Sequence, residues 1–539
     1  MDGIFSPPVP ANEPVRAYAP GSAERASLKR TLDQLSGQVL ELPCHVGGRW
    51  IETGKTVDVT MPTDHQHVLG RAHFAGPELV QQAIDAALKA RPAWAAMPWA
   101  ERASIFLRAA ALLAGPWRDR VNASTMLGQG KTCHQAEIDA ACELIDFLRF
   151  NVTYAAELYA EQPPVSPAGI WNRLDWRGLE GFVFAITPFN FTSIAANLCG
   201  APALMGNTVV WKPSPTQAHS AHVLMELFLE AGMPPGVINL VHGAGADVGD
   251  IVLAHPELAG VHFTGSTGVF QHIWKTVGTN IGGYRSYPRV VGETGGKDFI
   301  VAHPSADVQA LSVAIARGSF EYQGQKCSAA SRLYIPKSLW GEVRERVAGM
   351  VSEMKVGDVR DLDTFIAAVI DGRAWSKHRD ALALGRETGE ICFGGGCDDS
   401  TGWFVDPTMV RVDDPRHHLM ATELFGPIVT AHVYDDARFS ELLPVVDSTS
   451  PYALTGAVFA NDRVAVNEAL MGLRNAAGNF YINDKPTGAV VGQQPFGGGR
   501  ASGTNDKAGA KNNLVRWVSP HTIKENFNPP KSWRYPYLG

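Results

Sequence analysis

The sequence FVFAI at residues 182–186 is the first of three short apolar segments, and TVVW at 208–211 and VINLV at 237–241 follow it. A fourth segment, GVHFT at 260–264, completes the run, and stretches of helical composition separate all four. Apolar strands that alternate with helices are typical of a parallel sheet covered on both faces. The run therefore predicts an α/β fold.

The carboxyl end of such a sheet is the expected place for a ligand. Helix N-termini there present free N–H groups that suit phosphate. Gly265 and Ser266 follow the fourth strand directly and precede another helical stretch. The glycines after the third strand do not form Gly-x-Gly-x-x-Gly, because the position five after Gly243 is Val248. This motif therefore does not identify a dinucleotide site by itself.

Helices are expected before the run. Pro77 suits the first position of a helix, and apolar residues then repeat at four-residue spacing. Further helices are predicted over 101–114 and 132–150. In the last of these, three carboxylates lie off the apolar face, which predicts a solvated surface: Asp139, Glu143 and Asp146.

Two segments flank this region differently. Residues 161–177 are Pro-rich and then alternate in polarity, which predicts an excursion from the core such as a hairpin. Near the end of the chain, 514–523 is expected to be a strand, followed by a Pro, Trp and Tyr tail that we expect to be covered. A second α/β region is expected over about 302–490.

Composition bounds the function. The 539 residues exceed the size of one core, so two or three domains are expected. The net charge of −7, without a basic cluster, argues against a nucleic-acid partner. Seven scattered cysteines do not suggest a disulfide framework and favour a reducing compartment.

No metal site and no membrane segment are predicted. Cys392 and Cys397 frame Phe-Gly-Gly-Gly, but no second Cys or His pair lies at ligand spacing, so a glycine turn is expected. Residues 1–15 do not resemble a targeting peptide, and polar residues interrupt the weakly polar run at 194–211. The expected location is the cytoplasm.

Cys327 is a candidate nucleophile. It lies in GQKCS at 324–328, where a helical run passes through a glycine into a strand-like segment. A cysteine in such a place can be partly open and near positive electrostatic ends, which would lower the pKa of its thiol. The alternative is a free thiol that serves as a small apolar filler.

Three other residues are candidates with simpler alternatives. Asn190 follows a buried strand and offers an amide donor, although it could be a turn residue. Glu293 begins ETGGK and could be a solvated loop carboxylate. Lys212 ends a strand, where its cation could reach ribose hydroxyls or point to water.

Together these motifs resemble the aldehyde dehydrogenase family. Glu293 in ETGGK precedes Cys327 by 34 residues, and ELFGP at 423–427 follows both. These motifs stand in order after Asn190, Lys212 and FTGS at 263–266, and the resemblance extends from about residue 10 to the end.

Longer stretches look like one branch of the family, the stand-alone 1-pyrroline-5-carboxylate dehydrogenases. They are TPFNFT at 187–192, FEYQGQKCSA at 320–329, AAGNFYINDK at 476–485 and GQQPFGG at 492–498. The branch oxidises L-glutamate γ-semialdehyde to glutamate with NAD, in the second step of proline catabolism.

The resemblance implies a division of the chain. It implies an aldehyde dehydrogenase fold with a Rossmann-like NAD-binding lobe, an α/β catalytic lobe and an oligomerisation arm. The expected parts are an N-terminal arm and helix at 1–40, the NAD-binding domain at 41–160 and 178–300, the catalytic domain at 301–499, and the arm at 161–177 and 500–539.

The resemblance also implies the catalytic roles. Cys327 would attack the aldehyde, and the Asn190 amide and the Cys327 N–H would stabilise the oxyanion. After hydride transfer to nicotinamide, Glu293 would activate water to hydrolyse the thioester. Apolar surroundings are expected to raise the pKa of Glu293.

The implied binding residues form two groups. Lys212 and Glu423 would bind the riboses of NAD and Ser266 its pyrophosphate; the remaining cofactor residues are Ser214, Phe263, Gly265 and Phe425. The implied substrate residues are Glu143 near the amine, Ser328, Gly488 and Ala489 at the carboxylate, and Phe189 and Phe496. Ala489 stands where some members carry serine. Pro215 stands where the family commonly has glutamate, so the expectation of NAD over NADP depends on the branch.

Three alternatives and two partners complete the expectations. Another carboxylated semialdehyde such as succinic semialdehyde is the nearest alternative; a cofactor-independent cysteine hydrolase and an inactive scaffold are the others. No histidine lies in a motif that would serve as the base for Cys327. The resemblance implies a homodimer or higher homo-oligomer, and contact with a proline dehydrogenase.

Overall fold

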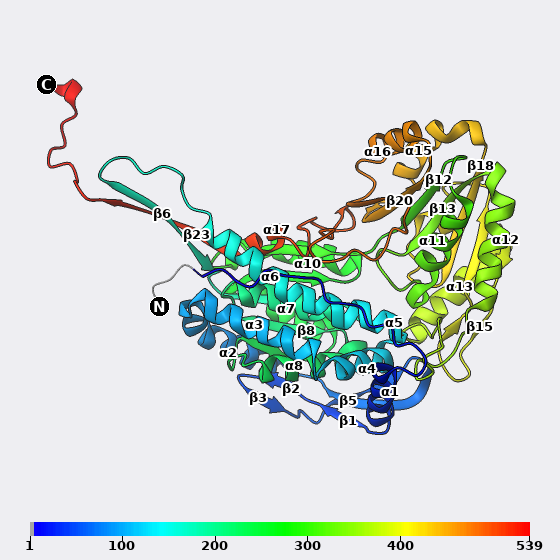
Figure 1. The fold of residues 1–539 in the computed structure, drawn as a ribbon. Helices are drawn as coiled ribbons and strands as arrows, with labels where there is room; N and C mark the ends of the chain where they lie inside the picture. The colour runs from blue at the N-terminus through cyan, green and yellow to red at the C-terminus, as the bar shows by residue number, and fades with distance from the viewer. Residues whose placement is uncertain (1–4) are drawn as a thin grey trace.

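A computed structural model describes residues 5–539. It contains two seven-stranded sheets, each covered by helices, and a long two-stranded ribbon (Figure 1). The first sheet has the strand order β11-β10-β7-β8-β9-β2-β3. Five neighbouring strands, from β11 at one edge to β9, are parallel and include all four predicted segments: β7 (Phe182–Thr187), β8 (Val209–Pro213), β9 (Ile238–Leu240), β10 (Leu258–Thr264) and β11 (Arg289–Glu293). At the other edge lie β2 (Cys44–Val46) and β3 (Arg49–Ile51).

Helices cover both faces of this sheet, as the apolar strands predict. Phe182 and Phe184 pack in one core, whereas Val183 and Ala185 pack in another, because successive side chains of a strand point to opposite faces. The connecting helices are α7 (Thr192–Leu204), α8 (Ala218–Glu230), α9 (Gly245–Ala254) and α10 (Thr267–Thr279). The preceding helices are α2 (Pro77–Ala96), α3 (Trp99–Ala114) and α4 (Arg118–Gln129), and α2 begins at the predicted proline.

The second sheet forms a separate lobe, at the other side of Figure 1. Its strand order is β14-β17-β18-β13-β12-β20-β21. These strands are β12 (Asp298–Ala302), β13 (Ala330–Pro336), β14 (Glu390–Phe393), β17 (Thr408–Val412), β18 (Ile428–Tyr434), β20 (Thr455–Phe459) and β21 (Asn479–Ile482). The flanking helices are α11 (Val308–Phe320), α12 (Lys337–Glu353), α13 (Gly372–Thr388), α15 (Phe439–Ser448) and α16 (Arg463–Gly472).

The Cys392–Cys397 segment is a turn, as expected. Gly394 and Gly395 have φ values of 74° and 97°, a left-handed conformation that favours glycine. The turn leads from β14 into β15 (Cys397–Asp398), which pairs with β16 (Phe404–Val405). Within residues 5–539, no group of three His, Cys, Asp or Glu side chains has an arrangement that could hold a metal ion.

The N-terminal region contributes a helix and a small sheet. Helix α1 (Ala23–Ser36) packs on α4, and several short strands follow it. Strands β1 (Leu40–Leu42), β4 (Thr56–Met61) and β5 (Asp64–His73) form a three-stranded sheet.

The predicted helix at 132–150 is interrupted, and its carboxylates are not solvated. It consists of α5 (Cys133–Ala136), a π-helical turn (Glu137–Cys142) and α6 (Glu143–Ala160). Asp139 is buried because it pairs with Lys131 at 2.6 Å. Asp146 is buried because it accepts hydrogen bonds from the Asn12 side chain and the Glu13 N–H. Partners on distant segments therefore override the helical pattern, and π-helical turns are frequent at functional sites.

The predicted arm is an extended ribbon and not a local hairpin. Strand β6 (Ile170–Gly178) pairs antiparallel along its whole length with β23 (Val518–Asn526). Residues 161–177 therefore leave the core as expected, but their strand partner comes from the end of the chain. The ribbon projects from the body, and the C-terminal tail continues beyond it (Figure 1).

The tail differs from its expectation. Trp533, Tyr535 and Tyr537 are exposed by 78%, 67% and 82% in the single chain. The expectation of a covered tail is therefore wrong for one copy of the chain.

Within residues 5–539, no helix is long and apolar enough to cross a membrane.

Candidate active site

A cleft of about 700 Å³ opens at the carboxyl ends of β7, β8 and β10. This is the place where an open parallel sheet binds ligands. All seven residues expected to bind a cofactor line the cleft: Lys212, Ser214, Phe263, Gly265, Ser266, Glu423 and Phe425. Asn190, Cys327 and Phe189 line it too, so the structure brings the predicted nucleophile and the predicted cofactor residues together.

Two charged groups of the cleft, Lys212 and Glu423, are largely buried and have few partners. Burial lowers the pKa of Lys212 to about 8, and its ammonium donates only to the carbonyl of Pro213, at 3.3 Å. Burial also raises the pKa of Glu423, which accepts a hydrogen bond from the Gly296 N–H at 3.0 Å. Both side chains retain hydrogen-bonding capacity that could serve hydroxyl groups of a ligand.

The close approach of Glu423 depends on a glycine. A Cβ atom added to Gly295 would lie 2.2 Å from the Glu423 carboxylate. The glycines of ETGGK therefore leave room for this side chain. Phe425 has a φ of 60°, and its ring packs edge-on against Phe189 with centroids 5.8 Å apart.

An unsatisfied helix N-terminus faces the cleft. Ser266 is the N-cap residue of α10, and its side chain accepts no capping hydrogen bond. The first N–H groups of the helix are thus available to an anion. Gly265, Ser266 and Gly268 line the cleft at this end.

Cys327 lies in a turn that strained backbone holds in place. Tyr322 and Gln323, in the 3-10 turn Glu321–Gly324, have φ values of 52° and 53°, which only a constrained structure gives to such residues. Gly324 has a φ of 65°, and a Cβ atom there would lie 2.3 Å from the carbonyl oxygen of Gly426. The loop before the cysteine therefore packs directly on the ELFGP segment.

The thiol and the carboxylate of the predicted pair are in contact. Cys327 Sγ lies 3.6 Å from Glu293 Oε1, within hydrogen-bonding distance for sulfur. Burial raises the pKa of Glu293 to about 8, as expected from apolar surroundings. Burial and the nearby carboxylates raise the pKa of Cys327 well above its usual range. The expectation of a lowered thiol pKa is therefore wrong for the free protein, in which the Glu293 carboxyl group is in contact with the thiol.

Asn190 is buried beside the same turn. Its side-chain amide donates to the carbonyl oxygen of Gln325 at 3.0 Å, two residues before the cysteine. The amide thus lies close to the nucleophile, and one of its donors is engaged by the turn. Gln325 in turn accepts from the Ile370 N–H at 2.9 Å, which fixes the turn to the second lobe.

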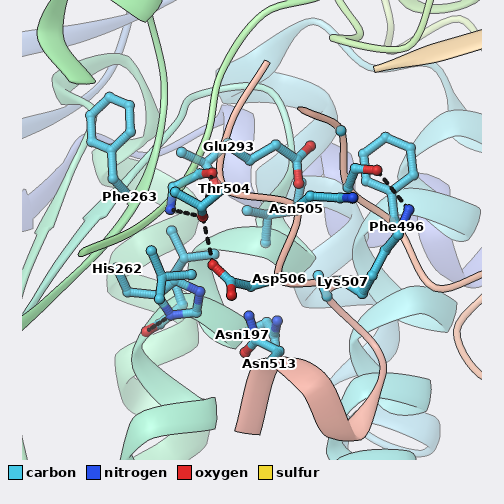
Figure 2. Close-up of a pocket in the computed structure, with 18 of the residues that line it drawn as sticks. Asn197, His262, Phe263, Glu293, Phe496, Thr504, Asn505, Asp506, Lys507 and Asn513 are labelled. Carbon is cyan, nitrogen blue, oxygen red and sulfur yellow. Dashed lines mark hydrogen bonds between the residues drawn. The ribbon is translucent and has the colours of Figure 1, made fainter. Parts of the chain in front are cut away.

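A second cavity, of about 50 Å³, adjoins Glu293 (Figure 2). It is lined by two of the expected substrate residues, Glu143 and Phe496, and by Glu293 itself. The other polar lining residues were not predicted: Asn197, His262, Thr504, Asn505, Asp506, Lys507 and Asn513. Five of them, from Thr504 to Asn513, lie in the polar part of the sequence after Gly499.

Hydrogen bonds order this small cavity. Thr504 Oγ1 donates to Asp506 Oδ2 at 2.6 Å, and the Lys507 ammonium donates to the carbonyl oxygen of Gly497 at 2.8 Å (Figure 2). The volume suffices for a few water molecules but not for a nucleotide. The carboxylate of Glu293 therefore adjoins both a nucleophilic thiol and a polar space of the size of water.

The remaining expected substrate residues differ in how closely the structure links them to the nucleophile. Ser328 is buried and shares a hydrogen bond of 2.7 Å with the Thr487 hydroxyl. Glu143 accepts from the Ser193 hydroxyl at 2.5 Å, and burial raises its pKa to about 8. Gly488 has a φ of 97° and is followed by Ala489, and neither residue lines the two cavities described here.

Comparisons with known proteins identify the family of this chain. The model of the aldehyde dehydrogenase family matches residues 50–523. The chain belongs to this family. It is 50% identical to the mitochondrial delta-1-pyrroline-5-carboxylate dehydrogenase of Dictyostelium discoideum, over 98% of the chain and 96% of the relative.

Solved structures extend this result to the fold. A crystal structure of the delta-pyrroline-5-carboxylate dehydrogenase from Mycobacterium tuberculosis bound with NAD is 54% identical, with a TM-score of 0.96 and full coverage of both chains. Proline utilization A from Bdellovibrio bacteriovorus is 28% identical, with a TM-score of 0.91, over 96% of this chain and 53% of the larger one. The aldehyde dehydrogenase fold predicted from the motifs is confirmed.

Proposed function

We propose that this protein oxidises L-glutamate γ-semialdehyde, the hydrolysed form of 1-pyrroline-5-carboxylate, to L-glutamate with NAD, as the second step of proline catabolism. The observation that carries the proposal is the contact of 3.6 Å between Cys327 and Glu293 beside a cleft of about 700 Å³. The names of relatives at 50% and 54% identity support the substrate.

The first step belongs to Cys327. Its sulfur attacks the aldehyde carbon, and the thiol proton passes to a base. Glu293 is in contact with the thiol and serves as that base. The oxygen of the resulting thiohemiacetal becomes negatively charged. The Asn190 amide and the Cys327 backbone N–H stabilise that charge, a role in which one donor accounts for about 100- to 1000-fold in rate.

The cleft fits NAD. Its volume falls in the range of nucleotide pockets, the free N-terminus of α10 suits a pyrophosphate, and Lys212 and Glu423 have spare donors and acceptors for ribose hydroxyls. Ser214, Phe263, Gly265 and Phe425 complete the lining. When bound, NAD supplies the hydride acceptor that turns the thiohemiacetal into a thioester.

The second step belongs to Glu293. Glu293 first passes the thiol proton to solvent. Its carboxylate then takes a proton from water, the hydroxide attacks the thioester carbon, and the carbon–sulfur bond breaks to release glutamate and the Cys327 thiolate. The small polar cavity beside Glu293 is a nearby place for that water and for its proton. With a pKa of about 8, Glu293 is a stronger base than an ordinary carboxylate.

The groups at the far end of the substrate distinguish it from other aldehydes. Ser328 and the N–H groups of Gly488 and Ala489 bind its carboxylate, and Glu143 lies near its amine. Phe189 and Phe496 flank its aliphatic stem. Succinic semialdehyde is shorter, so its carboxylate would not reach Gly488 while its aldehyde meets Cys327.

Four wider assignments accompany this proposal. The NAD-binding domain consists of residues 41–160 and 178–300, and the catalytic domain consists of residues 301–499. The oligomerisation arm consists of residues 161–177 and 500–539, and the N-terminal arm and helix of residues 1–40. The exposed tail supports a homo-oligomer in which a second copy covers it. The match to about half of proline utilization A supports contact with a proline dehydrogenase. We place the protein in the cytoplasm, although the relative from Dictyostelium discoideum is named mitochondrial.

Steady-state NADH formation tests the proposal. Purified protein would be given 1-pyrroline-5-carboxylate, succinic semialdehyde or propanal, each with NAD and with NADP. We expect the highest kcat/KM for the first aldehyde with NAD. A higher kcat/KM for succinic semialdehyde would identify that aldehyde as the substrate instead. No reduction of either nucleotide would contradict the activity.

A further inference from the structure

A buried cluster of charges adjoins the catalytic turn. Its anions are Asp139, from the π-helical turn, and Glu321, from the 3-10 turn before Cys327. Its cations are Lys131, Lys326 and Lys485, and four of the five side chains are exposed by 11% or less. The cluster therefore joins the helix that carries Glu143 to the segment that carries the nucleophile and to the loop after β21.

Short ion pairs connect its members. The Asp139 carboxylate lies 2.6 Å from the Lys131 ammonium and 3.5 Å from that of Lys326. The Glu321 carboxylate lies 3.5 Å from Lys326 and 3.8 Å from Lys485. Three ammonium groups thus share two carboxylates. The further carboxylate near Lys131 is Glu143, whose pKa burial raises to about 8, so the cluster holds more positive than negative charge. A buried charge without a partner is costly, so a matching anion would be bound favourably.

Lys485 is the member of the cluster that extends toward the substrate loop. It has the longest ion pair of the set, and its side chain is the most exposed, at 22%. Its ammonium donates to the carbonyl oxygen of Thr487 at 3.0 Å. A Cβ atom added to Gly488 would lie 2.8 Å from the same ammonium. The charge of Lys485 is therefore located where a side chain on Gly488 would begin.

The same loop is tied to the nucleophile. The Thr487 and Ser328 hydroxyls share a hydrogen bond of 2.7 Å, and Ser328 follows Cys327 directly. A carboxylate that accepts hydrogen bonds from the Gly488 and Ala489 N–H groups would thus lie within reach of the Lys485 charge. At such distances an ammonium attracts a carboxylate strongly in a partly buried site.

We propose that Lys485 is a specificity-determining residue, whose charge, only loosely paired with Glu321, makes this enzyme prefer aldehydes that carry a carboxylate. This inference rests on the proposed function and extends it to the chemical class of substrate. Lys485 acts on the carboxylate end and not on the reacting carbon. Its loss should therefore affect carboxylated aldehydes and spare uncharged ones of the same length.

Three aldehydes of the same chain length separate the groups involved. L-Glutamate γ-semialdehyde carries both an amine and a carboxylate, 5-oxopentanoate carries only the carboxylate, and pentanal carries neither. In Lys485→Gln the side chain can still donate to the Thr487 carbonyl but has no charge. We expect kcat/KM to fall about 10- to 100-fold for both carboxylated aldehydes, the range of one lost charged hydrogen bond, and to change less than twofold for pentanal.

Matched variants separate charge from loop structure. Lys485→Arg should restore most of the lost kcat/KM because it retains the charge. Lys355→Gln removes a surface charge that pairs with Asp361 and should change nothing. An equal loss for pentanal, or no loss for 5-oxopentanoate in Lys485→Gln, would overturn the assignment.

A second variant, which should change substrate affinity in the opposite direction, tests the proposal if Lys485→Gln does not fold. Glu321→Gln removes the anion that competes for Lys485 and should lower KM for 5-oxopentanoate without changing KM for pentanal; an unchanged or higher KM would overturn the assignment. Wild-type enzyme that does not prefer glutamate semialdehyde over pentanal would instead contradict the proposed function itself.

Discussion

The cleft and the small cavity each adjoin one member of the Cys327–Glu293 pair, and they differ in size and lining. The cleft has a volume of about 700 Å³ and is lined by Cys327, whereas the cavity has a volume of about 50 Å³ and is lined by Glu293. The first can hold a dinucleotide and the second only water. We infer that oxidation takes place on the cleft side of the 3.6 Å contact between thiol and carboxylate, and that hydrolysis uses the cavity side.

The two spaces also differ in what shapes them. Strand ends, a free helix N-terminus and the glycines of ETGGK shape the cleft. The cavity instead depends on a late polar segment, in which Asn505 and Lys507 have φ values of 55° and 52°. Substitutions should therefore separate the loss of covalent chemistry, of cofactor binding and of water activation.

Removal of the nucleophile should have the largest effect. Cys327→Ala is expected to reduce NADH formation to background, because Cys327 is the only cysteine that lines the cleft in the described part of the chain. NAD binding, followed by fluorescence titration, should persist. Cys397→Ala is the matched control and should retain full activity. Turnover by Cys327→Ala would assign the attack to another group.

Removal of the Asn190 amide should have the next largest effect. Asn190→Ala should lower kcat about 100- to 1000-fold, the usual cost of one oxyanion donor. Because the amide also bonds to the Gln325 carbonyl, the melting temperature must be measured in parallel. A loss of stability with kcat within tenfold of wild type would make Asn190 a turn residue, the simpler alternative.

Changes on the cofactor side should alter binding more than rate. Lys212→Met removes a buried cation that has only the Pro213 carbonyl as its partner, and should raise KM for NAD about tenfold, or about 1.5 kcal/mol. KM for the aldehyde should remain the same. The exposed Lys89→Met is a control for charge. An unchanged KM for NAD would remove Lys212 from the cofactor site.

The smallest expected effect is on stability. The pKa of Glu293 is about 8 in the native state, and an unfolded glutamate has a pKa of about 4.3. Between these values the native state retains a proton that the unfolded chain has released, so this group's contribution to stability falls as pH rises.

Glutamine does not titrate. Glu293→Gln should therefore gain stability relative to wild type between pH 5 and pH 8, by a few degrees in melting temperature. Thermal melts over this pH range would measure the difference. Parallel curves for the two proteins would contradict the raised pKa.

The sequence was sufficient for features that local pattern determines. The four strands of the first lobe have the length and composition of buried parallel strands, and their ends carry the ligand-facing residues by topology. The spacing of Glu293 and Cys327 within the family motifs likewise identified a pair that the structure brings into contact.

Features that depend on distant partners were not predictable in this way. The helical pattern assigned Asp139 to solvent, but Lys131 draws it into the interior. The pairing of β6 with β23 joins segments more than 300 residues apart in the sequence, and local alternation cannot show it. The thiol pKa of Cys327 depends on burial beside carboxylates, which its small polar neighbours in sequence do not reveal.

The central claim is that Cys327 holds the acyl group and Glu293 is needed to release it. The most direct measurement is the intact mass of Glu293→Gln after mixing with NAD and 1-pyrroline-5-carboxylate, together with the NADH formed in that mixture. We predict about one NADH per chain and a glutamyl thioester that peptide mapping locates on Cys327. Continued turnover without an adduct, or an adduct on another residue, would contradict the account.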